Sequence, residues 1–157
     1  MREEREVVRH RPRHSCCSGC GRTHVLLAAS MLVRRADGVA VIGAALLAKA
    51  AGAGHRTIAA GNGRRASTVR GWLRRFGSRA EQLRALSTGL LHQLDASAGS
   101  LLPTGTAWSD ALAVVGAAAA AAVRLFGPRC PWQFTVAASG GLLLAPGRVV
   151  GAVSNAR

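Results

Sequence analysis

The stretch from His55 to Arg74 follows a spacing that two short packed helices and a tight turn impose on a chain. Counted from His55, a small residue, Ala59, allows close helix approach at the fifth position, and Gly63 can supply a positive φ at the ninth. The apolar residues expected to form the shared core are Ile58, Val69 and Trp72. The pattern predicts a helix-turn-helix, a motif whose second helix typically lies in the DNA major groove.

Two positions of this stretch depart from the pattern. Asn62 stands where an apolar core residue is usual, and Arg64 places a charge at a second packing position. Either the motif is locally degraded or Asn62 caps the turn, since Asn-Gly is a favourable turn dipeptide. The alternative interpretation is two amphipathic helices joined by a glycine turn, without a role in DNA binding.

Positive charge is concentrated in the half of the chain that holds this pattern. Residues 1–76 carry 15 Lys or Arg and 4 acidic residues, whereas residues 77–157 carry 6 and 3. Such a segment attracts phosphate backbones and releases their counterions, so we expect affinity for nucleic acid. A GC-rich genome raises arginine content by itself, but codon bias does not explain why the charge gathers around the helix pair.

Helical periodicity continues before and after the pattern. Asp37 is expected to cap a helix that runs to about Ala51. The apolar side of this helix is expected to comprise Val41, Ala44, Ala45, Leu46 and Ala48. The helices of the pattern itself are expected at about His55–Ala60 and Ala66–Phe76.

Two more helices are expected later in the chain. Ser78 and Glu81 form a capping box for a helix over about 78–95. Its leucines recur at helical spacing, which suits a core or a dimer seam, and they are Leu83, Leu86, Leu90, Leu91 and Leu94. Another helix is expected over about 107–126, and the Gly-rich residues 127–157 are expected to be only weakly ordered.

The segment from Cys17 to Gly21 has the form of a zinc knuckle, in which two thiolates chelate one face of Zn²⁺ and glycines permit the turn. One knuckle supplies two of the four ligands. Residues that could complete the site are His10, His14, Cys16, His24 and Cys130. The alternative is a residual turn with free thiols. Short strands are expected on either side, at about Val7–Arg13 and Thr23–Leu27.

Two stretches together resemble a known family: Cys17-x-x-Cys20-Gly21-Arg22-Thr23-His24-Val25-Leu26-Leu27, and Ser67-Thr68-Val69-Arg70-Gly71-Trp72-Leu73-Arg74-Arg75-Phe76. They are similar to uncharacterised helix-turn-helix proteins of high-GC actinobacterial type, whose front end looks like the zinc ribbon and helix-turn-helix of insertion-sequence transposases. The resemblance covers about residues 7–76. It implies a double-stranded DNA binder with two Cys-x-x-Cys knuckles, of which this chain carries the second, at Cys17 and Cys20.

Carried over onto this chain, the resemblance implies two groups of DNA-binding residues. Those expected to face base edges are Arg65, Ala66, Ser67, Arg70, Gly71 and Arg74. Those expected to contact the DNA backbone are Arg56, Arg64, Thr68 and Arg75. Arg70 and Arg74 could each fork onto a guanine.

A catalytic function is not expected. Strand transfer by a transposase needs three carboxylates that hold two metal ions on a large fold. The acidic residues here are Glu3, Glu4, Glu6, Asp37, Glu81, Asp95 and Asp110, which crowd the N-terminus or stand singly near predicted helices. We therefore expect a sequence-selective DNA-binding protein without enzymatic activity, either a transcriptional regulator or a transposase-derived protein.

Two other interpretations stay open: a decayed fragment that binds nucleic acid through charge alone, and a helical protein-interaction scaffold. A homodimer is favoured because one helix-turn-helix reads few base pairs. Met1–Arg13 lacks the apolar segment of a secretory signal, and the apolar stretch Ala111–Val123 is shorter than the ~20 residues of a membrane span. We expect a cytoplasmic, nucleoid-associated protein with no membrane partner.

The expected fold is mainly α, with a homeodomain-like three-helix domain at its centre. A partial zinc-ribbon-like segment is expected over residues 1–36 and the helix-turn-helix domain over 37–76. A helical accessory or dimerisation region would occupy 78–126, followed by the tail at 127–157.

Overall fold

The computed structural model describes residues 2–3, 6–7, 11–26, 28–32, 35–103, 105–141 and 143–144. Its helices are α1 (Val39–Ala50), α2 (His55–Asn62), α3 (Ala66–Gly77), α4 (Ala80–Leu94), α5 (Ala107–Phe126) and α6 (Pro131–Ala138). Short antiparallel strands precede them: β1 (Arg2–Glu3) pairs with β2 (Glu6–Val7), and β3 (Arg13–Cys16) pairs with β4 (Thr23–Leu26). The expected mainly α fold with a small sheet near the N-terminus is confirmed.

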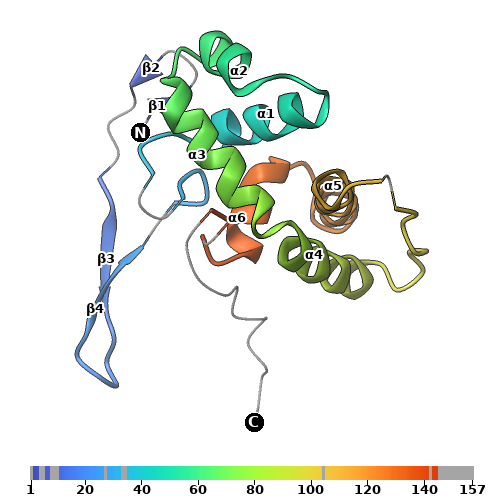
Figure 1. The fold of residues 1–157 in the computed structure, drawn as a ribbon. Helices are drawn as coiled ribbons and strands as arrows, with labels where there is room; N and C mark the ends of the chain where they lie inside the picture. The colour runs from blue at the N-terminus through green and yellow to red at the C-terminus, as the bar shows by residue number, and fades with distance from the viewer. Residues whose placement is uncertain are drawn as a thin grey trace.

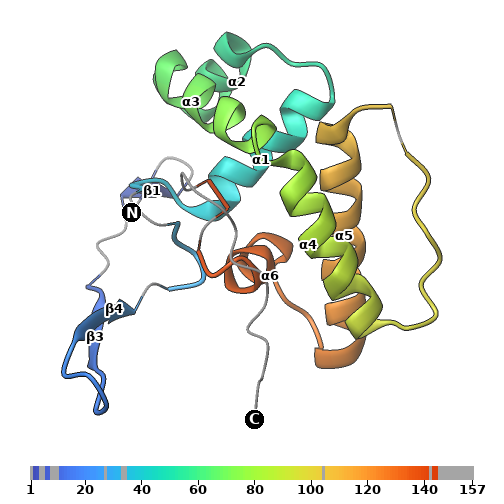
Figure 2. The same ribbon diagram turned by 60° about the horizontal axis from the view of Figure 1, so that its bottom comes forward.

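The helices fall into two groups. Helices α1, α2 and α3 gather at one end of the molecule, while α4 and α5 lie side by side and parallel at the other, joined by a linker that returns the chain to the start of α5 (Figures 1 and 2). Helix α6 packs against both α1 and α5. The β3–β4 hairpin projects away from the helices in both views.

One buried cluster draws side chains from all six of these helices. Its largest members include Trp72 and Phe76 of α3, which are almost completely shielded from solvent. The Phe76 ring meets the Trp108 ring of α5 edge-on, with centroids 4.6 Å apart, and the Trp108 indole N–H donates to the Leu46 carbonyl at 3.3 Å. Because burying one such side chain contributes about 1.5–3 kcal/mol, α3 anchors the two helix groups to each other.

Two helices start without the side-chain caps that the sequence predicts. Helix α1 follows Gly38 with no side-chain cap, and Asp37 instead pairs with Arg64. Helix α3 extends to Gly77, so the Ser78 hydroxyl donates to a carbonyl of that helix, and α4 starts after Arg79 without the expected capping box. Glu81 accepts a hydrogen bond from Arg84 on its own helix.

Side-chain burial also corrects one expected helix face. Ala44 faces solvent, whereas Ile42, which was not assigned to the apolar side of α1, is fully buried. The leucines of α4 pack largely toward α5, as a core stripe would, with Leu83 and Leu91 buried.

The segment after α5 is more ordered than its glycine content indicated. Helix α6 starts with Pro131, whose fixed φ suits the first turn of a helix, and Val136, Leu143 and Leu144 are buried in the core. The expectation of a weakly ordered tail is therefore wrong for this part of the chain. Residues 145–157 lie outside the described residues.

The first predicted strand is also misplaced. The hairpin strand begins at Arg13, where the predicted strand over Val7–Arg13 ends, and residues 8–10 of that prediction lie outside the described residues. The second strand, at Thr23–Leu26, is confirmed.

Helix α5 has 20 residues and a mean hydropathy of 1.6, so by length and composition it could cross a membrane. The apolar stretch within it had been expected to be too short for a span. In the fold, 39% of its most apolar window is buried, and it packs against α4 and α6. This helix alone is weak evidence for a membrane location.

Gly43→Ala is expected to lower the free energy of unfolding by about 1–3 kcal/mol, the usual cost of overpacking a core. A Cβ atom at Gly43 would overlap the Trp132 indole, through which α6 packs on α1. Gly116→Ala is the matched control, since Gly116 is an exposed helical glycine with open space around it. That change should raise stability by up to about 1 kcal/mol. Denaturant unfolding followed by circular dichroism measures both, and equal effects would contradict the packing assigned to Gly43.

Candidate nucleic-acid interface

The turn between α2 and α3 has the geometry that the sequence predicts. Gly63 has φ 61°, and its N–H donates to the Ala60 carbonyl at 3.2 Å. The N–H of Arg64 donates to the Ala59 carbonyl at 2.9 Å, which completes a Schellman end to α2. Any other residue at position 63 would be strained at this positive φ.

The apolar positions of the predicted pattern also form a core. Ile58, Ala59, Val69 and Trp72 are all buried, and α2 and α3 pack on α1. Asn62, at the departure from the pattern, is half-buried as the last residue of α2. Its Nδ2 atom is buried and has no hydrogen-bond partner among the described residues, so the expected capping role does not use this atom.

A buried ion pair holds this turn against the segment before α1. The Nε atom of Arg64 lies 2.6 Å from Oδ1 of Asp37, with only 10% and 8% of the two side chains exposed. The same guanidinium donates to the carbonyl oxygens of Asn62 and Gly63 at 3.2 and 3.4 Å. Arg64, expected to contact the DNA backbone, is thus engaged in holding the turn.

An open groove of about 670 Å³ runs along the exposed side of α3. The residues with hydroxyl or cationic side chains that line it are Arg35, Arg64, Arg65, Ser67, Thr68, Arg74 and Arg75. Asp37 is the acidic residue of the lining, and its charge is offset by Arg64. The groove therefore carries a net positive charge, and it is suited to a polyanion.

The shape of the groove depends on Gly71. A Cβ atom at this position would lie 3.0 Å from Nη1 of Arg75, so the Arg75 guanidinium lies back over the glycine. Because Gly71 has no side chain, the surface of α3 stays open there. The Arg75 guanidinium can therefore lie one helical turn away from its own Cα atom. Arg75 itself is half-buried.

Arg35 enters the groove from the segment before α1, and sequence reasoning did not identify it. Its Nη2 atom donates to the Leu144 carbonyl at 3.3 Å, which ties the groove wall to the C-terminal part of the core. Burial, and secondarily the positive charge of Arg75, lowers the pKa of the Arg35 guanidinium. A bound anion would relieve this repulsion between the two arginines. The only sequence signal was the isolated pair of arginines at 34 and 35.

The remaining predicted DNA-binding residues differ in their exposure to solvent. Those exposed on α3 or at its start are Arg65, Ser67, Arg70 and Arg74, and Arg56 is exposed on α2. Ala66 and Thr68 are half-buried, and Ala66 packs against the core, so its methyl group serves packing. Arg65, Ser67 and Arg74 line the groove, whereas Arg70 lies on α3 outside its lining and Arg56 lies on the neighbouring helix.

The cysteine turn lies at the end of the β3–β4 hairpin. The Cys17 N–H donates to the Arg22 carbonyl at 2.9 Å, and the Gly21 N–H donates back to the Cys17 carbonyl at 2.8 Å. Hydrogen bonds from the backbone N–H groups of Cys20 and Gly19, and from the Cys20 side chain, lower the pKa of the Cys17 thiol. Amides directed at a sulfur favour the thiolate that binds zinc. Cys17 and Cys20 therefore fit half of a tetrahedral site.

Of the other proposed zinc ligands, Cys16 lies beside the turn, where its thiol donates to the Gly21 carbonyl at 3.5 Å, but the histidines are not gathered there. His14 pairs with Val25 and Ser15 pairs with His24, so the two histidines lie on opposite faces of the hairpin. Cys130 precedes α6. In the part of the chain that the structure describes, His, Cys, Asp and Glu form no group of three or more with metal-binding geometry. His10 lies outside that part.

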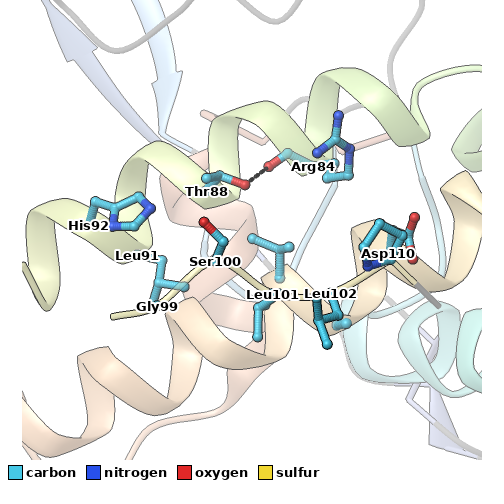
Figure 3. A pocket seen from close by; sticks show the side chains of 12 residues that line it. Arg84, Thr88, Leu91, His92, Gly99, Ser100, Leu101, Leu102 and Asp110 are labelled. Atoms are coloured by element: carbon cyan, nitrogen blue, oxygen red, sulfur yellow. Dashed lines mark hydrogen bonds between the residues drawn. The ribbon is translucent and has the colours of Figure 1, made fainter. Parts of the chain in front are cut away.

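A smaller cavity of about 150 Å³ lies between α4, α5 and the linker that joins them (Figure 3). Its walls mix apolar groups, such as Leu91 and Val114, with polar ones, such as His92. The Thr88 hydroxyl, which also lines it, donates to the Arg84 carbonyl at 2.9 Å. A cavity of this volume holds a ligand about the size of benzene. The cationic groove is the larger of these two sites.

Comparisons of the chain with protein families, with curated proteins and with solved structures find no match. The inference of function therefore depends on the residues and geometry described above.

Asp37→Ala is expected to lower the free energy of unfolding by about 3 kcal/mol, because it leaves the Arg64 charge buried without its carboxylate. The double variant Asp37→Leu, Arg64→Met should recover most of that loss, since removing both charges removes the desolvation cost. Thermal and denaturant unfolding of the single and double variants tests this. Equal losses in the two variants would mean that the ion pair is not the source of the stability.

Proposed function

We propose that the protein binds double-stranded DNA through a helix-turn-helix formed by α2 and α3, with α1 as the third helix of the unit. It would act without catalysis, as a transcriptional regulator or a transposase-derived DNA-binding protein. The observation that carries the proposal is the cationic groove along α3, built on a helix whose opposite side is buried in the core.

The arrangement of α3 supports insertion into the major groove. Val69, Trp72 and Phe76 mark the buried side of the helix. At 3.6 residues per turn, Arg70 and Arg74 fall on the opposite, exposed side, together with Ser67 and Gly71. An α-helix fits the width of the B-DNA major groove, and a forked guanidinium matches the two acceptors of guanine. Arg70 and Arg74 are therefore the proposed base-reading residues.

The proposed phosphate contacts flank this side of the helix. Arg65 precedes α3 and is exposed, while Arg35 and Arg75 face the groove from two different segments. Phosphate contacts position a protein on the duplex and supply most of the salt-dependent affinity. Arg64 is assigned no DNA contact in this proposal, because it pairs with Asp37.

Arg70→Ala, Arg74→Ala should abolish the enrichment of a sequence motif when the protein selects from a random duplex pool at ~150 mM salt. Each lost guanine contact is expected to cost about 1–3 kcal/mol of discrimination. The matched control is Arg84→Ala, Arg124→Ala, which removes the same charge from α4 and α5 outside the groove.

The control variant should select the same motif as the unaltered protein. A chain that enriches no motif, and whose two double variants weaken binding equally, would be a charge-only binder and would overturn base reading by α3. Binding that is unchanged in both variants and insensitive to salt would contradict DNA binding by this surface altogether.

Arg35→Ala is expected to weaken binding to all duplexes alike and to reduce the salt slope by about 0.9, as loss of one phosphate contact does. Arg35→Lys is the matched control, since it keeps the positive charge and should keep the slope. Affinities measured by fluorescence anisotropy over a salt series give both slopes. A changed motif, or an unchanged slope for Arg35→Ala, would exclude Arg35 as a phosphate contact.

A further inference from the structure

The β3–β4 hairpin presents a pair of thiols away from the rest of the protein. All eight residues of its strands are exposed, as are Cys17 and Cys20 in the turn. Both ribbon views show the hairpin extending from the helices rather than lying on them (Figures 1 and 2). A second molecule could therefore approach the turn without contact between the helical bodies.

The turn holds Cys17 and Cys20 close together at the end of the hairpin. Gly21 has φ 66°, and the cross-turn hydrogen bonds between Cys17 and its neighbours close the loop tightly. A Cβ atom at Gly19 would lie 3.9 Å from the Cys17 sulfur, so the turn folds back close to that sulfur. This arrangement holds two thiolates for a metal with tetrahedral preference, for which Zn²⁺ is the usual choice.

Two ligands do not complete a tetrahedral site. His14 and His24 lie on opposite faces of the hairpin, so they cannot both reach one metal at the turn in this arrangement. Within the described residues, no third His, Cys, Asp or Glu joins the pair in a metal-binding group. A second hairpin of the same kind would supply the two missing thiolates.

We propose that one Zn²⁺ ion joins two copies of this protein, coordinated by Cys17 and Cys20 of each. On binding, each of the four thiols loses its proton to solvent, and the Zn–thiolate centre carries a charge of −2. Arg22 directly follows the turn in each copy, so its cationic side chain lies close to that charge and offsets part of it. The exposed Val25 and Leu26, 54% and 49% accessible, lie on opposite faces of the hairpin, so each face offers one apolar side chain to a second copy.

The proposal does not depend on DNA binding, and its test needs no DNA. The full chain, kept reduced, is titrated with Zn²⁺, while sedimentation velocity follows the mass and metal analysis follows the stoichiometry. We expect one zinc per two chains, a monomer-to-dimer shift with added Zn²⁺, and reversal by a chelator. Co²⁺ in place of Zn²⁺ should give the visible absorption of a tetrahedral thiolate site.

The variant Cys17→Ser, Cys20→Ser should lose the zinc-dependent dimer completely. Because the two positions are exposed, circular dichroism should show an unchanged helix content. Cys130→Ser is the matched control, since Cys130 lies before α6 and away from the hairpin, and it should dimerise as the unaltered chain does.

Three results would overturn the proposal. One is a monomer that binds one zinc by itself, which would show that this chain completes its own site. Another is zinc binding or dimerisation that survives in the double cysteine variant. The third is a dimer that forms without zinc and separates only on reduction, which would identify a disulfide between copies.

Discussion

The ion pair between Asp37 and Arg64 is the interaction on which the proposed interface depends. It joins the segment before α1 to the turn between α2 and α3, and both charges are nearly excluded from solvent. Arg35 lies two residues before Asp37, so the pair also sets where that guanidinium enters the groove. Breaking a buried pair costs more than the pair contributes over two apolar groups. Its value here is to specify one arrangement of two chain segments.

Helix α3 connects stability to the proposed function. Its buried side supplies the two largest side chains of the core, and its opposite side supplies two cations of the groove, Arg74 and Arg75. A rigid helix positions charged side chains more reproducibly than a loop, because the ordering entropy is already lost on folding. Gly71 also contributes to the surface of the groove. It lies on the exposed side, where a larger residue would displace Arg75.

Different interactions stabilise the hairpin and the helical body. The body is held by a continuous apolar cluster, whereas the hairpin residues are exposed and its turn is held by backbone hydrogen bonds. On the proposed zinc binding, the hairpin would gain order, since metal binding and local folding are coupled. A zinc-linked pair would also bring two copies of α3 into one assembly, as reading two half-sites of duplex DNA requires.

The amino-acid sequence by itself determined the local features of this protein. Spacing predicts the positions of α2 and α3, the positive φ at Gly63, the core residues of the helix pair and the turn from Cys17 to Gly21. Each of these depends on residues within one or two helical turns. Only the tertiary structure decided the partners of residues far apart in the chain. Asp37 pairs with Arg64 instead of capping α1, and Arg35 lines the groove. The packing of Trp132 on Gly43 holds the segment after α5 against the core. Long-range pairing depends on which surfaces meet once the helices pack, and no local pattern contains that information.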